Sequence, residues 1–212
     1  MAILFSPEEF AKLKDLMIYF NCALRDITTR IDILLEDFRN FQHKDPVEHI
    51  KTRIKSPESI AGKLARLNYD ITAKNARDKL YDIAGLRIIC PYARDIYYIA
   101  DVLRLQPDLN VTTEKDYISR PKPSGYRSYH MIIDVPVYFT RETYKIPVEV
   151  QLRTQAMDFW ATLEHSVRYK YQEPGKIPKR ISDELAACAD RIAELDEKMF
   201  EIHDEVFKIK TV

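Results

Sequence analysis

Charged and apolar side chains alternate along one short segment of the 212-residue chain, IPVEVQLRT at residues 146–154. Such alternation predicts a strand whose two faces differ. The apolar residues share one face and the polar residues share the other: Ile146, Val148, Val150 and Leu152 against Glu149, Gln151 and Arg153. A carboxylate, an amide and a guanidinium side by side are costly to bury unless water, a partner or a ligand satisfies them. The pattern fits either a ligand-binding face or the solvated face of an edge strand.

A second carboxylate strengthens the ligand-binding interpretation. Asp82 stands immediately before IAGLRIIC, residues 83–90, whose β-branched residues predict another strand. If the two strands are neighbours, Asp82 and Glu149 can hold one divalent cation between them. Two carboxylates completed by substrate phosphates are a usual arrangement for Mg²⁺. The two residues therefore predict a magnesium site on this sheet.

Basic residues gather in two segments that can bind a phosphate-bearing ligand. The first, HIKTRIKSPESIAGKLAR at residues 49–66, includes Arg53, Lys55, Lys63 and Arg66. The second, KDYISRPKPSGYRSYH at residues 115–130, alternates cations with tyrosines: Lys115, Arg120, Lys122 and Arg127 with Tyr117 and Tyr126. Arginine binds phosphate or lies flat against a purine, and tyrosine stacks on a base. Together the segments predict a nucleotide site, although the first also fits a solvated amphipathic helix.

Two long helices are predicted near the ends of the chain. Apolar residues recur there at alternating steps of four and three: Leu13, Met17, Phe20, Leu24, Ile27, Ile31, Leu34, Phe38 and Phe41, and then Ile181, Leu185, Cys188, Ile192, Leu195, Met199, Ile202, Val206 and Ile209. Ser6, Pro7 and Glu9 supply a start signal for the first helix. Each pattern predicts a seam packed on another helix. The sequence leaves open whether the seams pair within a chain, pair between subunits or simply pack on a core.

Strands and helices alternate between these two helices. Helical spacing occurs in residues 60–68, 92–105 and 153–171, and strand-like segments occupy residues 83–90, 109–117, 128–139 and 144–154. This interleaving predicts an α+β or mixed α/β sheet domain.

The composition argues against several other classes of protein. Lysine plus arginine and aspartate plus glutamate both number 33, so any polyanion site must be local. Cys22, Cys90 and Cys188 are few and far apart, and we expect reduced thiols in apolar surroundings. No apolar run reaches the ~18 residues of a membrane span, and the start lacks a leader pattern. We therefore expect a soluble cytoplasmic protein without a membrane partner.

Four segments, in this order, resemble the synthetase domain of the RelA/SpoT family: HIKTRIKSPESIAGKLAR, DIAGLRI, KDYISRPKPSGYRSYH and EVQLRTQAMDFWATLEHSVRYKY. The resemblance covers about residues 45–172. The chain as a whole resembles the stand-alone small alarmone synthetases of bacteria. It divides the chain into an N-terminal helical region (1–44), the synthetase core (45–172) and a C-terminal helix for oligomerisation (173–212).

The resemblance implies a particular reaction and fold. Members of this family transfer the β,γ-pyrophosphate of ATP to the ribose 3′-hydroxyl of GDP or GTP, giving AMP and (p)ppGpp. The implied fold is a nucleotidyltransferase-like mixed sheet flanked by helices, with Mg²⁺ as cofactor. The small members assemble as homotetramers through terminal helices.

The resemblance also implies roles for individual residues. Catalysis and metal binding fall to Asp82 and Glu149. ATP binding falls to Arg53, Lys55, Ser59, Lys63, Arg66 and Arg87, with Arg53 and Arg87 on either side of the adenine. The acceptor nucleotide is assigned to Lys115, Lys122, Tyr126, His130, Gln151, Asp158 and Glu164. Tyr126 stacks on guanine in this scheme, and the loop around Gly125 moves to admit it.

Other functions stay open on the sequence alone. Relatives of this fold direct pyrophosphate to adenine nucleotides or to RNA 3′ ends, and a catalytically silent regulator would only bind nucleotide or RNA. A neutral chain lacks the broad basic surface expected for RNA, and a pure binder has no need of two metal carboxylates. His203-Asp204 resembles the central pair of a metal-dependent phosphohydrolase, but no aspartate follows Asp204 to complete such a site.

Overall fold

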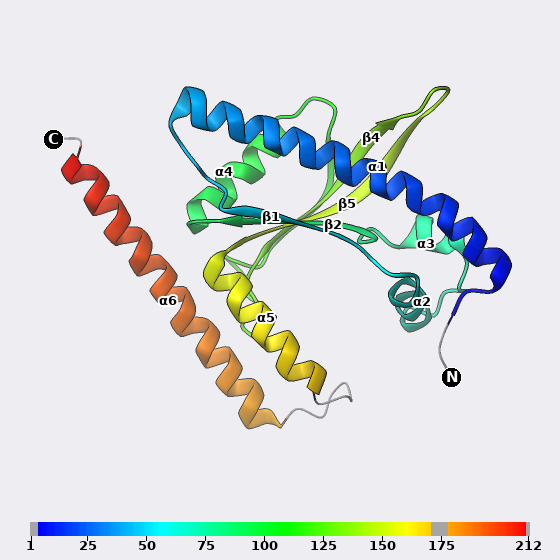
Figure 1. The fold of residues 1–212 in the computed structure, drawn as a ribbon. Coiled ribbons are helices and arrows are strands. Elements are labelled where there is room, and N and C mark those ends of the chain that lie inside the picture. Colours follow the sequence, from blue (N-terminus) through cyan, green and yellow to red (C-terminus); the bar gives the residue numbers. More distant parts are fainter. Residues whose placement is uncertain (1–3, 171–177, 211–212) are drawn as a thin grey trace.

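The computed structural model describes residues 4–170 and 178–210. The elements are α1 (Pro7–Asp37), a π-helical turn (Phe38–Gln42), β1 (His49–Ile54), α2 (Pro57–Arg66), α3 (Ala73–Lys79), β2 (Ala84–Cys90), α4 (Ala93–Arg104), β3 (Asn110–Asp116), β4 (Tyr129–Tyr138), β5 (Thr143–Thr154), α5 (Gln155–Lys170) and α6 (Lys179–Lys210). One five-stranded mixed sheet forms the centre, with helices on both sides (Figure 1). The predicted fold class is confirmed. No helix within the described ranges is long and apolar enough to span a membrane.

The strand order places the two predicted carboxylate-bearing segments side by side. The order is β1-β2-β5-β4-β3, in which β2 and β5 run parallel and the other pairs run antiparallel. Gly85 lies opposite Glu149, and Arg87 lies opposite Gln151. The alternating segment is therefore a central strand rather than an edge strand. Its polar face must be satisfied by partners or by a ligand.

Helix α1 covers the apolar face of the sheet. It begins as predicted, because Ser6 Oγ accepts a hydrogen bond from the Glu9 N–H at 3.3 Å and Pro7 occupies the first turn. The helix runs across β5, β4 and β2 (Figure 1), and Phe20 and Ile27 share one buried core with Val148 and the rest of the apolar face. Of the alternatives that the sequence left open for this seam, α1 packs on the core formed by the sheet rather than on another helix. The sheet offers the wider apolar surface to bury.

The end of the predicted α1 seam is also displaced. Leu35 is buried where the pattern named Leu34, and Phe41 is 80% exposed. A pattern that averages 3.5 residues per turn drifts around a straight helix over many turns. Residues 38–42 then form a π-helical turn that ends at His43 with φ of +52°. The wider turn rotates Phe41 off the buried face.

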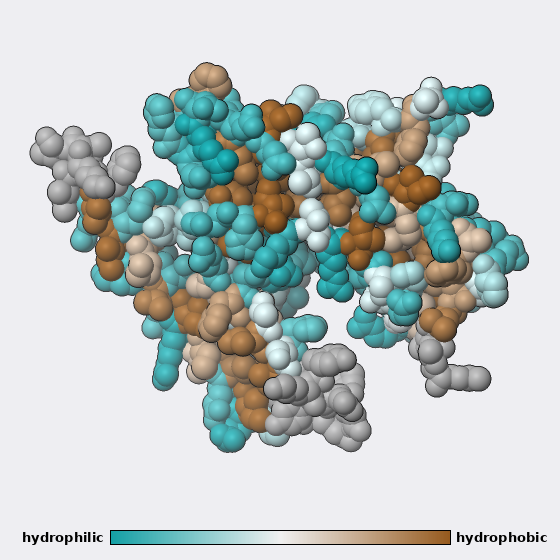
Figure 2. All heavy atoms as spheres, in the orientation of Figure 1, coloured by the Kyte–Doolittle hydropathy of each residue, from teal (hydrophilic) through white to brown (hydrophobic). Residues whose placement is uncertain are grey.

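Helix α6 lies on the other side of the sheet and packs on α5 (Figure 1). The contact forms a small apolar cluster centred on Trp160, Ala161 and Ala189. Beyond it, four seam residues are 45–63% exposed: Leu195, Met199, Ile202 and Val206. Figure 2 shows the resulting apolar stripe along α6. Cys188 is exposed, contrary to expectation, and both the side chain of Ile209 and the 172/173 boundary lie outside what the structure describes.

The sequence did not predict β1 or α3. β1 is an edge strand with no buried residue, and cations alternate with its β-branched residues instead of leaving a continuous β-branched run. α3 has only seven residues, of which Ala73 and Ala76 are buried. Short elements with so few buried residues are easily taken for loops in a sequence, and here the neighbouring sheet and α1 hold them in place.

We expect the effect of a leucine on stability to depend on whether its side chain is buried in the core. Leu103 of α4 is fully buried, whereas Leu105, just beyond the same helix, is 78% exposed. Leu103→Ala should lower the free energy of unfolding by about 2–5 kcal/mol, and Leu105→Ala should change it by less than about 0.5 kcal/mol. Urea denaturation at one fixed protein concentration measures both. Equal losses would contradict the described packing of α4.

Candidate active site

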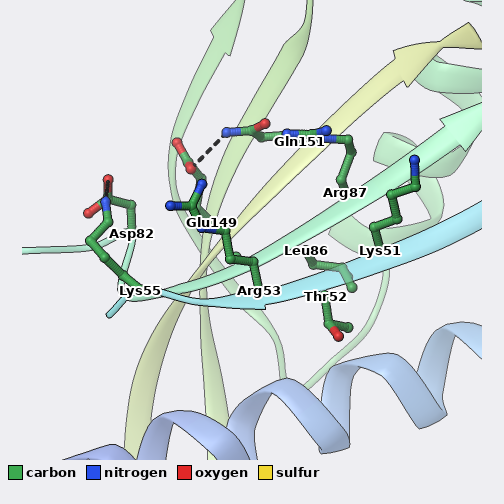
Figure 3. Close-up of a pocket in the computed structure, with 10 residues that line it drawn as sticks. Lys51, Thr52, Arg53, Lys55, Asp82, Leu86, Arg87, Glu149 and Gln151 are labelled. Carbon is green, nitrogen blue, oxygen red and sulfur yellow. Dashed lines mark hydrogen bonds and ion pairs between the residues drawn. The ribbon is translucent and has the colours of Figure 1, made fainter. Parts of the chain in front are cut away.

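A cavity of about 530 Å³ opens on the polar face of the sheet, beside β1, β2 and β5 (Figure 3). Its walls carry Lys51, Thr52, Arg53, Lys55, Asp82, Gly85, Leu86, Arg87, Glu149 and Gln151. Gly85 lies between Arg53 and Glu149 in the strand register. Because glycine has no side chain, the floor stays open at that point. The cavity thus joins three of the six predicted ATP-binding residues, Arg53, Lys55 and Arg87, to both predicted carboxylates.

Asp82 is held by two lysines. Its Oδ2 accepts hydrogen bonds from Lys55 Nζ at 2.7 Å and Lys63 Nζ at 2.5 Å. Its Oδ1 is buried and has no hydrogen-bond partner in the described part of the chain. Burial by itself raises the pKa of Asp82, but the two ammonium groups outweigh burial and leave this pKa below its ordinary value. Asp82 is therefore an ionised carboxylate with one oxygen available to a ligand.

Glu149 has a different set of partners on the neighbouring strand. Its Oε1 lies 3.3 Å from His130 Nδ1, and its Oε2 accepts a hydrogen bond from Gln151 Nε2 at 2.9 Å. Burial raises the pKa of Glu149, yet His130 and Gln151 bring it below the ordinary value. The negative charge of Asp82, which lines the same cavity, acts in the opposite direction and raises the pKa of Glu149.

This pair of carboxylates suits a hard divalent cation. Both groups are ionised, and Asp82 Oδ1 still lacks a partner within the described ranges. Those ranges contain no group of three or more histidine, cysteine, aspartate or glutamate residues that could hold a metal. The protein therefore offers two ligands, and a bound phosphate would have to supply others, as is common for Mg²⁺. The magnesium site stays a prediction that the residues fit.

Two arginines line the cavity from adjacent strands. Arg53 projects from β1 and Arg87 from β2 (Figure 3). Arg87 Nη1 donates to Asp158 Oδ1 at 3.0 Å, while its buried Nε has no partner among the described residues. Burial, helped by the nearby Arg153 charge, lowers the pKa of Arg87. Flat, partly desolvated guanidinium groups are suited to bind phosphate or to stack on a purine.

The tyrosine-rich loop reaches the cavity through His130. Tyr126 Oη lies 2.8 Å from His130 Nε2, and the other ring nitrogen of His130 faces Glu149. Lys122 Nζ lies over the rings of Tyr117 and Tyr126, at 4.5 Å and 4.7 Å from their centroids. The structure thus brings three predicted acceptor residues next to the carboxylate pair.

Gly125 fixes the same loop against α6. Its φ is +87°, and a Cβ added there would lie 2.5 Å from Ala189 Cβ and 3.2 Å from Ala186 Cα. Arg127 Nη2 also donates to Asp190 Oδ1 at 3.2 Å. The loop can approach the helix this closely only with glycine at position 125. In this structure the predicted mobile loop is docked on the C-terminal helix.

Several predicted residues are not part of the cavity lining. Asp158 of α5 is connected to the cavity by the hydrogen bond that it accepts from Arg87. Ser59, near the start of α2, accepts a hydrogen bond from Ser56 Oγ at 3.1 Å. Arg66 on α2, Lys115 on β3 and Glu164 on α5 are not among the described residues that line it. Their predicted roles stay predictions.

Three residues of this site had no role assigned from the sequence. Lys51 and Thr52 line the cavity, and Arg153 binds several of the predicted acceptor residues. The alternation of Lys51, Arg53 and Lys55 was a usable signal, because a strand would place all three on one face. The alternation in residues 146–154 placed Arg153 on the polar face of its strand, but its partners come together only in the fold.

A nucleotidyltransferase-like sheet with a two-carboxylate, cation-lined cavity is a site for nucleotide polyphosphates. The model of the region found in RelA / SpoT proteins matches residues 52–174. The chain is 42% identical to the GTP pyrophosphokinase YwaC of Bacillus subtilis over 91% of both chains, and 36% identical to YjbM of the same organism over 88% of both.

Solved structures agree with this assignment. Small alarmone synthetase 1 of Bacillus subtilis bound to its product pppGpp superposes with a TM-score of 0.84 and 32% identity, covering 92% of this chain and 98% of that one. The same enzyme bound to AMPCPP gives a TM-score of 0.77 and 30% identity, covering 93% and 99%. The chain belongs to the RelA/SpoT family.

Replacing Gly125 should strain the loop that docks on α6. Gly125→Ala should lower the free energy of unfolding by about 2 kcal/mol, because alanine is disfavoured at this φ and its Cβ meets Ala189. In an Ala189→Gly background the same change should cost about 1 kcal/mol less. Urea denaturation of the four proteins measures this coupling. Additive costs would show that the loop does not contact α6 at this point.

Proposed function

We propose that the protein is a (p)ppGpp synthetase that works in the cytoplasm. It transfers the β,γ-pyrophosphate of ATP to the ribose 3′-hydroxyl of GDP or GTP, giving AMP and guanosine tetraphosphate or pentaphosphate. The observation that carries the proposal is that Asp82, just before β2, and Glu149, on the neighbouring strand β5, line one cavity together with several cations. The family membership and the names of its relatives support the same reaction.

ATP occupies the β1–β2 side of the cavity in this proposal. Arg53 and Arg87 hold the adenine between flat guanidinium groups. Lys55 and Lys63, which donate hydrogen bonds to Asp82, also bind the ATP phosphates in this proposal. Ser59 and Arg66 add contacts from α2. Positively charged groups are therefore ready before the nucleotide arrives.

The chemical step is a displacement at the β-phosphorus of ATP. The acceptor 3′-oxygen forms a bond to that phosphorus, the bond from the phosphorus to the α-phosphate oxygen breaks, and AMP leaves with the electron pair. Glu149 lies at the junction of both halves of the site and takes the hydroxyl proton. Asp82 and Glu149 would hold Mg²⁺, whose chemical contribution would be to neutralise phosphate charge. Positioning and charge neutralisation supply most of the rate.

The acceptor nucleotide occupies the side formed by β4, β5 and the tyrosine loop. Tyr126 stacks on the guanine, and Lys115, Lys122 and His130 bind the acceptor phosphates. Gln151, Asp158 and Glu164 complete the acceptor contacts. A carboxylate such as Asp158 distinguishes guanine from adenine, because only guanine offers adjacent N1–H and amino donors. Asp158 accepts hydrogen bonds from Arg87 and Arg153.

The other candidate functions have less support. The chain has no net charge, so it lacks the electrostatic attraction expected for RNA ends as acceptors. A silent nucleotide-binding regulator would leave two ionised carboxylates close together without a chemical purpose. An assay of labelled products distinguishes transfer to a guanine nucleotide from these alternatives.

The proposed reaction predicts labelled guanosine tetraphosphate or pentaphosphate. Purified protein is incubated with Mg²⁺, ATP labelled at the γ-phosphate, and GDP, GTP, GMP or ADP in turn, and products are resolved by anion-exchange chromatography. Glu149→Gln should lower kcat by at least about a hundredfold with a small change in the KM for ATP. Removal of Mg²⁺ with a chelator should stop the reaction.

Glu36→Gln, an exposed change on α1, serves as the matched control and should keep the wild-type rate. Transfer to ADP alone would replace the proposal by an adenine-nucleotide synthetase. No transfer to any nucleotide would refute it, and RNA 3′ ends and then simple binding would be tested next.

We propose further that the chain forms a homotetramer through its terminal helices. The support is the apolar stripe on α6, where Leu195, Met199, Ile202 and Val206 are exposed in the single chain. A second copy of the chain would bury this stripe, because exposed apolar seams of this length are characteristic of helix pairing.

Light scattering coupled to size exclusion tests the assembly. The wild type should have four chain masses, and the double change Met199→Asp and Ile202→Asp should give a smaller species because it places charges in the seam. Glu197→Ala, on the exposed side of the same helix, should keep the wild-type mass. A wild-type monomer would contradict the proposal.

A further inference from the structure

Arg153 is a buried arginine at the end of β5, next to the proposed acceptor side. Its side chain is only 6% exposed. All three guanidinium nitrogens donate hydrogen bonds: Nε to Ser128 Oγ at 3.3 Å, Nη1 to Asp158 Oδ1 at 2.9 Å, and Nη2 to Tyr126 Oη at 2.7 Å and Gln151 Oε1 at 3.0 Å. The guanidinium also lies over the Tyr126 ring, 5.2 Å from its centroid.

These contacts join separate parts of the fold. Tyr126 and Ser128 belong to the loop before β4, Gln151 belongs to β5, and Asp158 belongs to the first turn of α5. A buried guanidinium is tolerated only where its donors are satisfied. The planar, five-donor fork of arginine can reach several acceptors at once, whereas lysine is a single point charge. One side chain therefore fixes the relative positions of three elements.

The hydrogen-bond network continues from Arg153 to Glu149 through Tyr126 and His130. Arginine can only donate, so the Tyr126 oxygen accepts from Arg153. With a neutral imidazole whose Nδ1–H donates to Glu149, the Tyr126 hydroxyl donates to His130 Nε2. The chain of hydrogen bonds then runs from Arg153 to Glu149 in one direction. Arg153 thus orients both the aromatic ring and the imidazole beside the carboxylate.

We propose that Arg153 is the positioning residue for the acceptor nucleotide. It does not touch substrate, because its nitrogens are occupied by protein groups; it holds Tyr126, Gln151 and Asp158 in the arrangement that receives the base. A second link supports this role: Arg153 and Arg87 both donate to Asp158 Oδ1, at 2.9 Å and 3.0 Å. The inference rests on the proposed function, in which these partners bind the acceptor.

The test separates acceptor binding from ATP binding. Arg153→Lys keeps a positive charge but cannot reach all four partners, and Arg153→Met removes the charge. Isothermal titration calorimetry measures the Kd of GDP and of a non-hydrolysable ATP analogue, and kinetics measure the KM of each substrate. Both variants should weaken GDP binding by about ten- to a hundredfold and should change binding of the ATP analogue by less than about twofold.

The controls distinguish positioning from loss of fold. Arg141→Lys, in the exposed turn between β4 and β5, should leave both affinities unchanged. Tyr126→Phe removes only the hydroxyl that Arg153 binds, so its effect on GDP binding should be smaller and should not add to that of Arg153→Met. Circular dichroism and thermal melting establish the folded fraction of each variant.

Two results would overturn the inference: GDP affinity within about twofold of the wild type in folded Arg153→Lys and Arg153→Met, or equal weakening of both ligands. A wild type that binds no GDP would also overturn it. If the wild type binds GDP in an Arg153-dependent manner but forms no product, the proposed function fails and the positioning role stands.

Discussion

Two ionised carboxylates in the lining of one cavity are the constraint on which the site depends. Asp82, just before β2, and Glu149, on β5, both line it, and each is only about one-fifth exposed. Two such charges are tolerated only where cations or hydrogen-bond donors compensate them. Lys55 and Lys63 do this for Asp82, and His130 and Gln151 do it for Glu149. The cations that stabilise the carboxylates also supply positive charge for a phosphate ligand.

The rest of the fold keeps the polar face of the sheet accessible while burying the other. Helix α1 closes the apolar face, so the sheet gains its core from one side. On the polar side, α5 contacts β5 and α6 packs on α5 (Figure 1), while residues of β1, β2 and β5 line the cavity. The C-terminal helix also contacts the tyrosine loop at Gly125. The helix with the exposed apolar stripe is therefore in direct contact with the proposed acceptor loop.

Much of this arrangement was predictable from sequence, and the limits have physical causes. Alternation in residues 146–154 correctly separated the polar face of β5 from its buried face, because a strand has a strict period of two. Asp82 and Glu149 could be paired because a β-branched run followed the first and surrounded the second. The path of α1 was not predictable, since an apolar helix face fits a sheet as well as another helix. The same alternation in residues 146–154 placed Arg153 on the polar face but did not reveal its role, because its four partners lie on three elements and sequence spacing does not show such contacts.

The carboxylate pair can be tested directly through metal binding. Electron paramagnetic resonance of Mn²⁺, a substitute for Mg²⁺ at oxygen ligands, reports free metal as protein is added with and without a non-hydrolysable ATP analogue. Because the protein supplies two carboxylates that are already paired with cations, Mn²⁺ should bind tightly only when the analogue's phosphates complete the site. With the analogue present, the wild type should bind Mn²⁺ more tightly than the analogue alone binds the metal in solution. Asp82→Asn should lose most of this extra affinity. Equal Mn²⁺ binding by the wild type and Asp82→Asn would contradict the account.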